Sequence, residues 1–216
     1  MIVWPSSDRA VGGLTVLGGL LTLVATLPTR WYGPTPTDSY VFDPPRFSPL
    51  WIERTVAPAV AVAAAVLILT GLVWLFRRDR EWMPRWQDWF AIVSVVGAAV
   101  GTLATMLLVS VGGRAAADPT AALNALLGLG LALLAGLLLL PGLLAWGIGY
   151  LRDGRHRLGV ALAGAPVAAV VVVGASITLD VGTSPVGALP VVLPVGAAVV
   201  IVGYDLCVGA GDDAAA

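Results

Sequence analysis

The sequence predicts an all-α fold, a polytopic transmembrane helical bundle of about six helices, and three observations lead to it. The 216 residues are 58% hydrophobic and only 12% charged, whereas a soluble domain carries about 25% charged residues. The charges sit in short clusters between apolar runs of about 17 residues or more, the length that a helix needs to cross a bilayer. These runs also lack the polar face that a soluble amphipathic helix repeats every 3.6 residues.

The apolar runs are bounded by prolines and charged clusters, which gives each helix its expected limits. We expect helices at about 10–27, 56–76, 89–111, 119–150, 158–179 and 185–208. The first run is followed by no small-x-small cleavage motif, so we interpret it as a helix and not as a signal peptide. Residues 1–208 then form one transmembrane domain, and residues 209–216 form a flexible acidic tail.

Small residues recur at four-residue spacing in two of these helices. Gly97 and Gly101 form a GxxxG motif, and Gly128, Ala132 and Gly136 form a second stripe. This spacing lets two helix backbones approach closely in lipid. We therefore expect these five residues at helix contacts.

Prolines interrupt the fourth and sixth helices. A proline inside a helix removes one backbone hydrogen bond and clashes with the preceding turn. Pro141, Pro190 and Pro194 are therefore expected at helix kinks. Broken helices expose backbone carbonyls that can line a binding site in a transporter.

The arginines predict the orientation. All twelve basic residues are arginine, and an internal N-terminus places eight of them on the cytoplasmic side, as the positive-inside rule favours. Both termini would then be cytoplasmic, in a multi-pass protein of the cell (plasma) membrane. At the first inner loop, expected lipid-facing anchors are Arg77, Arg78, Arg80, Trp82 and Trp86.

The segment at about 28–55 is the longest stretch predicted outside the membrane. It holds six prolines, which exclude a long helix. Its aromatic residues are Trp31, Tyr32, Tyr40, Phe42, Phe47 and Trp51. Two interpretations stay open: an aromatic belt at the headgroups, or an ordered outer surface that binds a partner or ligand.

Two inner loops share a short pattern. Residues 76–80 and 150–155 both read aromatic-x-Arg-Asp-(Gly)-Arg, each at the inner end of a predicted helical hairpin. An old duplication of the two hairpins explains the likeness. Independent selection for basic inner loops explains it equally simply, and we favour that interpretation.

The sequence contains few groups that could perform catalysis. It has no HExxH, GxSxG or P-loop motif, and a single histidine, His156, and a single cysteine, Cys207, give no metal-ligand cluster. No ionisable residue lies near the centre of a predicted helix, and the deepest acid, Asp205, has no evident role. The serine and threonine hydroxyls are expected to bond to backbone carbonyls or between helices, and Asn124 is expected in helix packing. We therefore predict no cofactor, and a net charge of −1 makes nucleic acid an improbable partner.

The composition resembles that of multi-pass membrane proteins of salt-loving archaea: arginine without lysine, helices rich in Ala, Val and Gly, and an acidic tail. The resemblance implies no activity. The sequence favours a non-enzymatic membrane component or complex subunit that associates with itself or with another membrane protein through small-residue helix faces. The alternative is a small-solute permease or channel-like subunit that uses the proline-broken helices.

Overall fold

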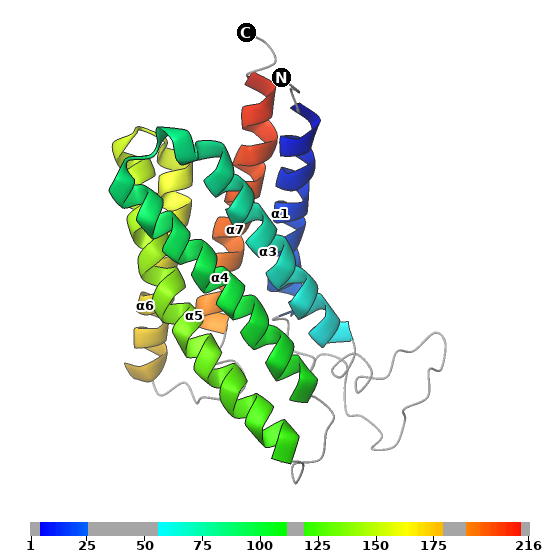
Figure 1. Cartoon of the computed structure of the whole chain (residues 1–216). Coiled ribbons are helices and arrows are strands. Elements are labelled where there is room, and N and C mark those ends of the chain that lie inside the picture. The colour runs from blue at the N-terminus through cyan, green and yellow to red at the C-terminus, as the bar shows by residue number, and fades with distance from the viewer. Residues whose placement is uncertain (1–4, 26–55, 112–118, 179–188, 213–216) are drawn as a thin grey trace.

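The computed structural model describes residues 5–25, 56–111, 119–178 and 189–212 (Figure 1). Six α-helices account for nearly all of them, with no strand in these ranges: α1 (Pro5–Ala25), α3 (Ala57–Asp79), α4 (Arg85–Val111), α5 (Pro119–Arg152), α6 (His156–Thr178) and α7 (Leu189–Asp212). The short 3-10 helix η3 (Arg80–Trp82) follows α3. The predicted all-α class is confirmed. The predicted 28–55 segment with its six aromatic residues lies outside the described residues.

Several helices continue beyond the apolar runs that predicted them. α3 ends at Asp79 and α5 at Arg152, each a little beyond the predicted end, and α1 begins at Pro5. Backbone hydrogen bonding does not stop where apolar side chains stop, so the helices extend through polar residues until a turn intervenes. As a result, both aromatic-x-Arg-Asp patterns begin on the last turn of a helix.

The contacts between the helices form a ring. Each helix contacts the next one along the chain, α7 also packs against α1, and α3 touches α7. The start of α1 and the end of α7 lie at the same end of the molecule as the turns after α3 and α5 (Figure 1). We call this the arginine-rich end and define it by residues 77–88 and 152–157, which hold seven arginines and four acidic residues.

Among the described residues, α3, α4 and α5 are long and apolar enough to cross a membrane. The outer face of α5 carries large apolar side chains: Leu126, Leu133 and Leu137 are 70%, 73% and 72% exposed. A soluble monomer rarely exposes so continuous an apolar surface. This face is suited to hydrocarbon or to another protein.

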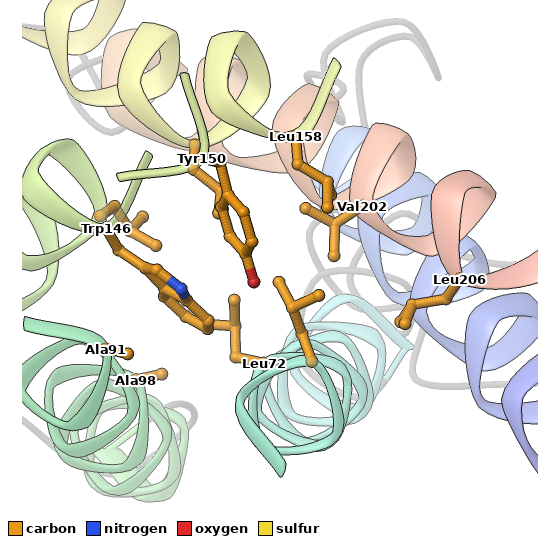
Figure 2. Packing of buried hydrophobic residues seen from close by; sticks show 11 residues of the cluster. Leu72, Ala91, Ala98, Trp146, Tyr150, Leu158, Val202 and Leu206 are labelled. Atoms are coloured by element: carbon orange, nitrogen blue, oxygen red, sulfur yellow. The ribbon is translucent and has the colours of Figure 1, made fainter. Parts of the chain in front are cut away.

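The largest hydrophobic core lies toward the arginine-rich end, where five helices converge (Figure 2). Trp146 and Tyr150 of α5 fill its centre and are almost fully buried. Side chains from the other four helices surround them, among them Leu72, Ala91, Leu158, Val202 and Leu206. The core therefore fixes the ends of α3, α5, α6 and α7 close to one another.

α4 and α5 form an antiparallel pair whose contacts repeat every seven positions, with a small residue at each of these positions on α5. Four pairs face each other, each with the two residue numbers shifted by seven: Gln87 and Gly149, Ser94 and Gly142, Gly101 and Ala135, Leu108 and Gly128. A methyl group built on Gly142 would lie 2.5 Å from the Ser94 Oγ and 2.9 Å from its backbone nitrogen. Seven-residue spacing keeps two helices in register as they coil around each other, and glycine allows their backbones to approach.

α1 and α7 also pack through small residues at seven-residue spacing. Gly12 faces Gly203 and Gly19 faces Gly196, again seven residues apart on both helices. A methyl group on Gly12 or on Gly19 would come within 2.7 Å of the carbonyl oxygen of its partner glycine. Neither pair has room for a larger side chain.

Candidate functional site

A buried carboxylate lies at the arginine-rich end. Asp79, the last residue of α3, is only 4% exposed. An isolated carboxylate away from water is strongly disfavoured unless it is paired and hydrogen-bonded. The residues around Asp79 are therefore the first place to look for a site.

Three side chains bind the Asp79 carboxylate. Tyr150 donates its hydroxyl to Oδ2 at 2.7 Å, and Arg155 donates Nη1 to the same oxygen at 2.7 Å. Arg78 binds both oxygens, with Nε 2.9 Å from Oδ1 and Nη2 3.3 Å from Oδ2. A second carboxylate, that of Asp205 on α7, lies 3.6 Å from Arg78 Nη2. One network thus joins α3, α5, α7 and the turn before α6.

The turn after α5 places Arg155 in this network. Gly154 has a φ of +79°, and its N–H donates to the carbonyl of Leu151 while that of Arg155 donates to the carbonyl of Tyr150. These two bonds are those of a Schellman motif, in which glycine takes the left-handed position after the helix. The chain reverses at once, and the Arg155 guanidinium carbon lies 5.7 Å from the centre of the Tyr150 ring.

The turn after α3 has a different geometry. Asp79 keeps helical torsions, η3 follows, and Met83 is extended, as expected of a residue that precedes a proline. Arg80 turns back over the ring of Phe76, 5.5 Å from its centre, and lies 3.5 Å from the carboxylate of Asp88. This turn holds Asp79 inside the molecule and Arg80 at the surface.

A cavity of about 270 Å³ opens beside the network, lined by Asp79, Trp82, Met83, Tyr150, Asp153 and Arg155. It is slightly smaller than drug-sized ligand pockets, which span about 300–1,000 Å³. Its walls combine one guanidinium, two carboxylates and an indole. Such a cavity suits a small polar group rather than a large apolar ligand.

Further contacts hold the same ends of the helices together. Trp74 donates its indole N–H to Asp8 at 2.7 Å and so joins α3 to α1. Gln87 is fully buried and donates to the Trp146 carbonyl at 3.3 Å. The Gln87 Oε1 and the indole nitrogen of Trp146 find no partner among the described residues. Polar contacts between helices are therefore concentrated at this end.

The polar groups inside the helices have structural roles. The hydroxyls of Thr70, Ser94, Thr102 and Thr105 each donate to the carbonyl four residues earlier, as predicted. Asn124 donates to Ser110 at 3.1 Å and joins α5 to α4, also as predicted. Among the described residues no three His, Cys, Asp or Glu side chains lie close enough to hold a metal ion. The arrangement can bind ions and polar groups, and no nucleophile with an adjacent base is found in these ranges.

The predicted packing residues have different positions. Gly97 lies against α5, since a methyl group there would be 2.7 Å from the Leu139 nitrogen, and Gly101 faces α5 as well. Gly128 is buried beneath Leu108. The other two residues of its predicted stripe, Ala132 and Gly136, contact no other helix closely: the first is exposed, and a methyl group on the second would meet nothing within 4 Å. Any packing role of these two would be against another molecule and stays a prediction.

The prolines lie at different positions within their helices. Pro190 is the second described residue of α7, and the predicted kink there stays a prediction. Pro141 and Pro194 lie inside α5 and α7, and both helices continue through them. Pro166 is a further internal proline, in α6.

The predicted anchors also divide into two groups. Trp82 is 86% exposed and Trp86 lies under the guanidinium of Arg152, and Arg77 is exposed. Arg80 is exposed but faces Asp88. Arg78 was predicted to face lipid, whereas its side chain is only 22% exposed and binds Asp79, because a buried carboxylate beside it requires a cation.

Asp79 was not among the residues singled out in the sequence, and neither were its ligands Tyr150 and Arg155. All three do belong to the repeated aromatic-x-Arg-Asp pattern, which was the available signal. Comparison with protein-family models, with curated proteins and with solved structures finds no match to this chain. Its function is therefore inferred from its own geometry.

Proposed function

We propose that this chain is an integral membrane protein that crosses the bilayer six times and acts as a non-enzymatic component, associating with itself or with a partner membrane protein. The observation that carries the proposal is the seven-residue small-residue packing of α4 on α5 and of α1 on α7. Helices this close leave no channel between them. The interior is then a rigid scaffold, and its outer surfaces are where other molecules bind.

The position of the cavity favours a scaffold over a permease. A permease that used the break at Pro141 needs a polar path to that residue. The cavity at Asp79 is lined only by residues at helix ends and turns, and Gly142, next to Pro141, is packed against Ser94. A solute that entered at this end would meet the Trp146 and Tyr150 core.

The distribution of charge supports an orientation. The arginine-rich end carries three more positive than negative charges, and cytoplasmic loops are the ones enriched in arginine. Because the beginning of α1 and the end of α7 lie at this same end (Figure 1), both termini belong on the cytoplasmic side. The exposed leucine face of α5 then lies at hydrocarbon depth, open to lipid or to a second protein.

The experiment that tests the proposal is purification of the full chain in a mild detergent, with its mass determined by light scattering and co-purifying proteins identified. A discrete homo-oligomer or one stoichiometric partner supports the proposal. A lone monomer that mediates solute flux in liposomes would overturn it.

A pair of variants tests the packing on which it rests. Gly142→Val would press a side chain onto Ser94 and should abolish the yield of folded protein. Gly130→Val is the matched control, because Gly130 lies on the exposed side of α5 and a methyl group there meets nothing within 4 Å. Equal yields from the two variants would contradict the packing role.

A further inference from the structure

The charged and polar side chains that line the cavity beside Asp79 indicate which kind of ligand it can bind. One wall is Arg155, whose side chain is 50% exposed and which uses only Nη1 on Asp79. A guanidinium has five N–H donors, and no other acceptor is found for this one among the described residues. The remaining donors are available for an anion such as a phosphate.

Asp153 adds a hydrogen-bond acceptor to the cavity. Its side chain lines the cavity and is exposed, and no ion pair or side-chain hydrogen bond is formed by it among the described residues. The other carboxylate, Asp79, already accepts from three side chains. An occupant that displaces water from both groups would offer a hydrogen-bond donor to Asp153 as well as an anion to Arg155.

The surrounding charge decides which donor is favoured. Arg77, Arg85, Arg152 and Arg157 form no ion pair with any described residue, so the arginine-rich end retains a positive field. A phosphate whose charge is offset by its own ammonium group gains less from this field than a phosphate that carries only hydroxyl groups. The occupant is therefore a net anion with neutral donors, that is, a phosphate that carries hydroxyl groups.

Trp82 supplies the third wall. Its indole is 86% exposed at the mouth of the cavity, at the end of the apolar stretch Ala57–Trp82. Tryptophan at this position is typical of the headgroup level of a membrane. The cavity thus opens where phospholipid headgroups lie, if the helices cross the bilayer as proposed above.

We propose that this cavity binds the glycerol phosphate headgroup of an anionic phospholipid, with the phosphate on Arg155, the glycerol hydroxyls donating to Asp153 and the headgroup against Trp82. This site rests on the proposed membrane placement. It would attach a specific lipid to the junction of α3, α5 and α6, beside the Asp79 network that joins them.

The test is native mass spectrometry of the full chain in detergent, titrated with dioleoyl phosphatidylglycerol. Phosphatidic acid, which has the phosphate without the hydroxyls, is the key comparison, and phosphatidylethanolamine offers an ammonium instead. We expect phosphatidylglycerol to bind at least about fivefold more tightly than either, because each hydrogen bond to a charged group adds that much or more. Equal binding of phosphatidic acid, or tighter binding of phosphatidylethanolamine, would overturn the assignment.

Two variants in the cavity and one control outside it, all at exposed positions, keep the test independent of folding. Asp153→Ala should abolish the preference for phosphatidylglycerol and strengthen binding of phosphatidic acid, since a negative charge is removed. Trp82→Ala should weaken phosphatidylglycerol several-fold. Arg157→Ala, an exposed arginine outside the cavity, should lower both affinities equally. An unchanged preference in Asp153→Ala would overturn the role of the hydroxyls.

Soluble glycerol 3-phosphate distinguishes the source of the headgroup. If it binds with the same Kd as phosphatidylglycerol, the ligand is a free solute and the lipid assignment is wrong. The proposed function fails separately, if alkaline carbonate extracts the chain from membranes. A chain that resists carbonate but shows no lipid preference would refute this site alone.

Discussion

The turn between α3 and α4 and the turn between α5 and α6 begin with the same residue pattern, but only the first buries its aspartate. Each starts with an aromatic residue on the last turn of its helix, and each has an arginine whose guanidinium lies over that ring: Arg80 over Phe76 at 5.5 Å, and Arg155 over Tyr150 at 5.7 Å. The aspartates differ. Asp79 is 4% exposed, whereas Asp153 is exposed.

A single glycine accounts for the difference. The second turn has Gly154 between its aspartate and its final arginine, and the first turn has no residue there. Gly154 ends α5 in a Schellman motif and reverses the chain, while the first turn continues into η3. In the second turn the arginine therefore points inward and the aspartate outward. The likeness of the two patterns predicts a shared position at helix ends, and the inserted residue decides whether the aspartate or the arginine faces the Asp79 network.

The largest expected effect comes from removing the buried charge. Asp79→Ala leaves Arg78 and the buried Tyr150 hydroxyl without their shared acceptor. We expect the free energy of unfolding to fall by about 2–4 kcal/mol, toward the lower end because Arg155 can turn to water. The measurement is unfolding by sodium dodecyl sulfate in mixed micelles, followed by tryptophan fluorescence.

Asp153→Ala is the matched control for that variant. The residue occupies the same place in the pattern but is exposed, so its loss should change the free energy of unfolding by less than about 0.5 kcal/mol. Similar losses in the two variants would show that the two turns are equivalent and that burial does not distinguish them.

A smaller effect is expected from the residue that creates the asymmetry. In Gly154→Ala the added methyl group meets nothing within 4 Å, so the only penalty is the left-handed backbone, about 1–2 kcal/mol. Gly130→Ala provides the contrast, since it is equally uncrowded but lies within α5. There alanine should stabilise the helix by up to about 1 kcal/mol. Opposite signs in the same unfolding assay are the expected result, and a neutral Gly154→Ala would remove the explanation given above.

The helices could be predicted from the sequence because each apolar run is bounded by prolines or charges. Their ends could not, since α3 and α5 extend over polar residues to Asp79 and Arg152. On α5 the contact with α4 follows seven-residue spacing, whereas the prediction used four-residue spacing, and the role of Ala132 and Gly136 stays a prediction. Small residues occur there at both four- and seven-residue spacing, and only the partner helix decides which set is used. On α4, Ser94 packs against Gly142 and Leu108 packs against Gly128.

The repeated pattern contains Asp79, Tyr150 and Arg155, but their contact could not be predicted from it. Asp79 meets Tyr150 and Arg155 across more than 70 residues, and its own neighbours suggest a solvated basic loop. An acid among arginines normally indicates a water-exposed surface. Its burial depends on the convergence of α3, α5 and α6 around Trp146 and Tyr150 (Figure 2). The six-crossing topology and the cytoplasmic termini stay predictions.

The smallest expected effect is that of removing Arg80, and its dependence on salt should differ from that of the buried Tyr150 hydroxyl. Arg80 is 61% exposed and 3.5 Å from Asp88, so Arg80→Ala should lower the free energy of unfolding by no more than about 0.5–1 kcal/mol. Tyr150→Phe removes a buried hydrogen bond to Asp79 and should lower it by about 1.5 kcal/mol or more. Raising the salt from 0.1 M to 1 M shortens the screening length from about 10 Å to about 3 Å. The Arg80 effect should then shrink toward zero, because water and ions reach that pair. The Tyr150 effect should persist, because the hydroxyl and the carboxylate are enclosed by the core. If both effects decline together with salt, the Asp79 network is as solvated as the Arg80 pair, and the two turns differ in sequence but not in environment.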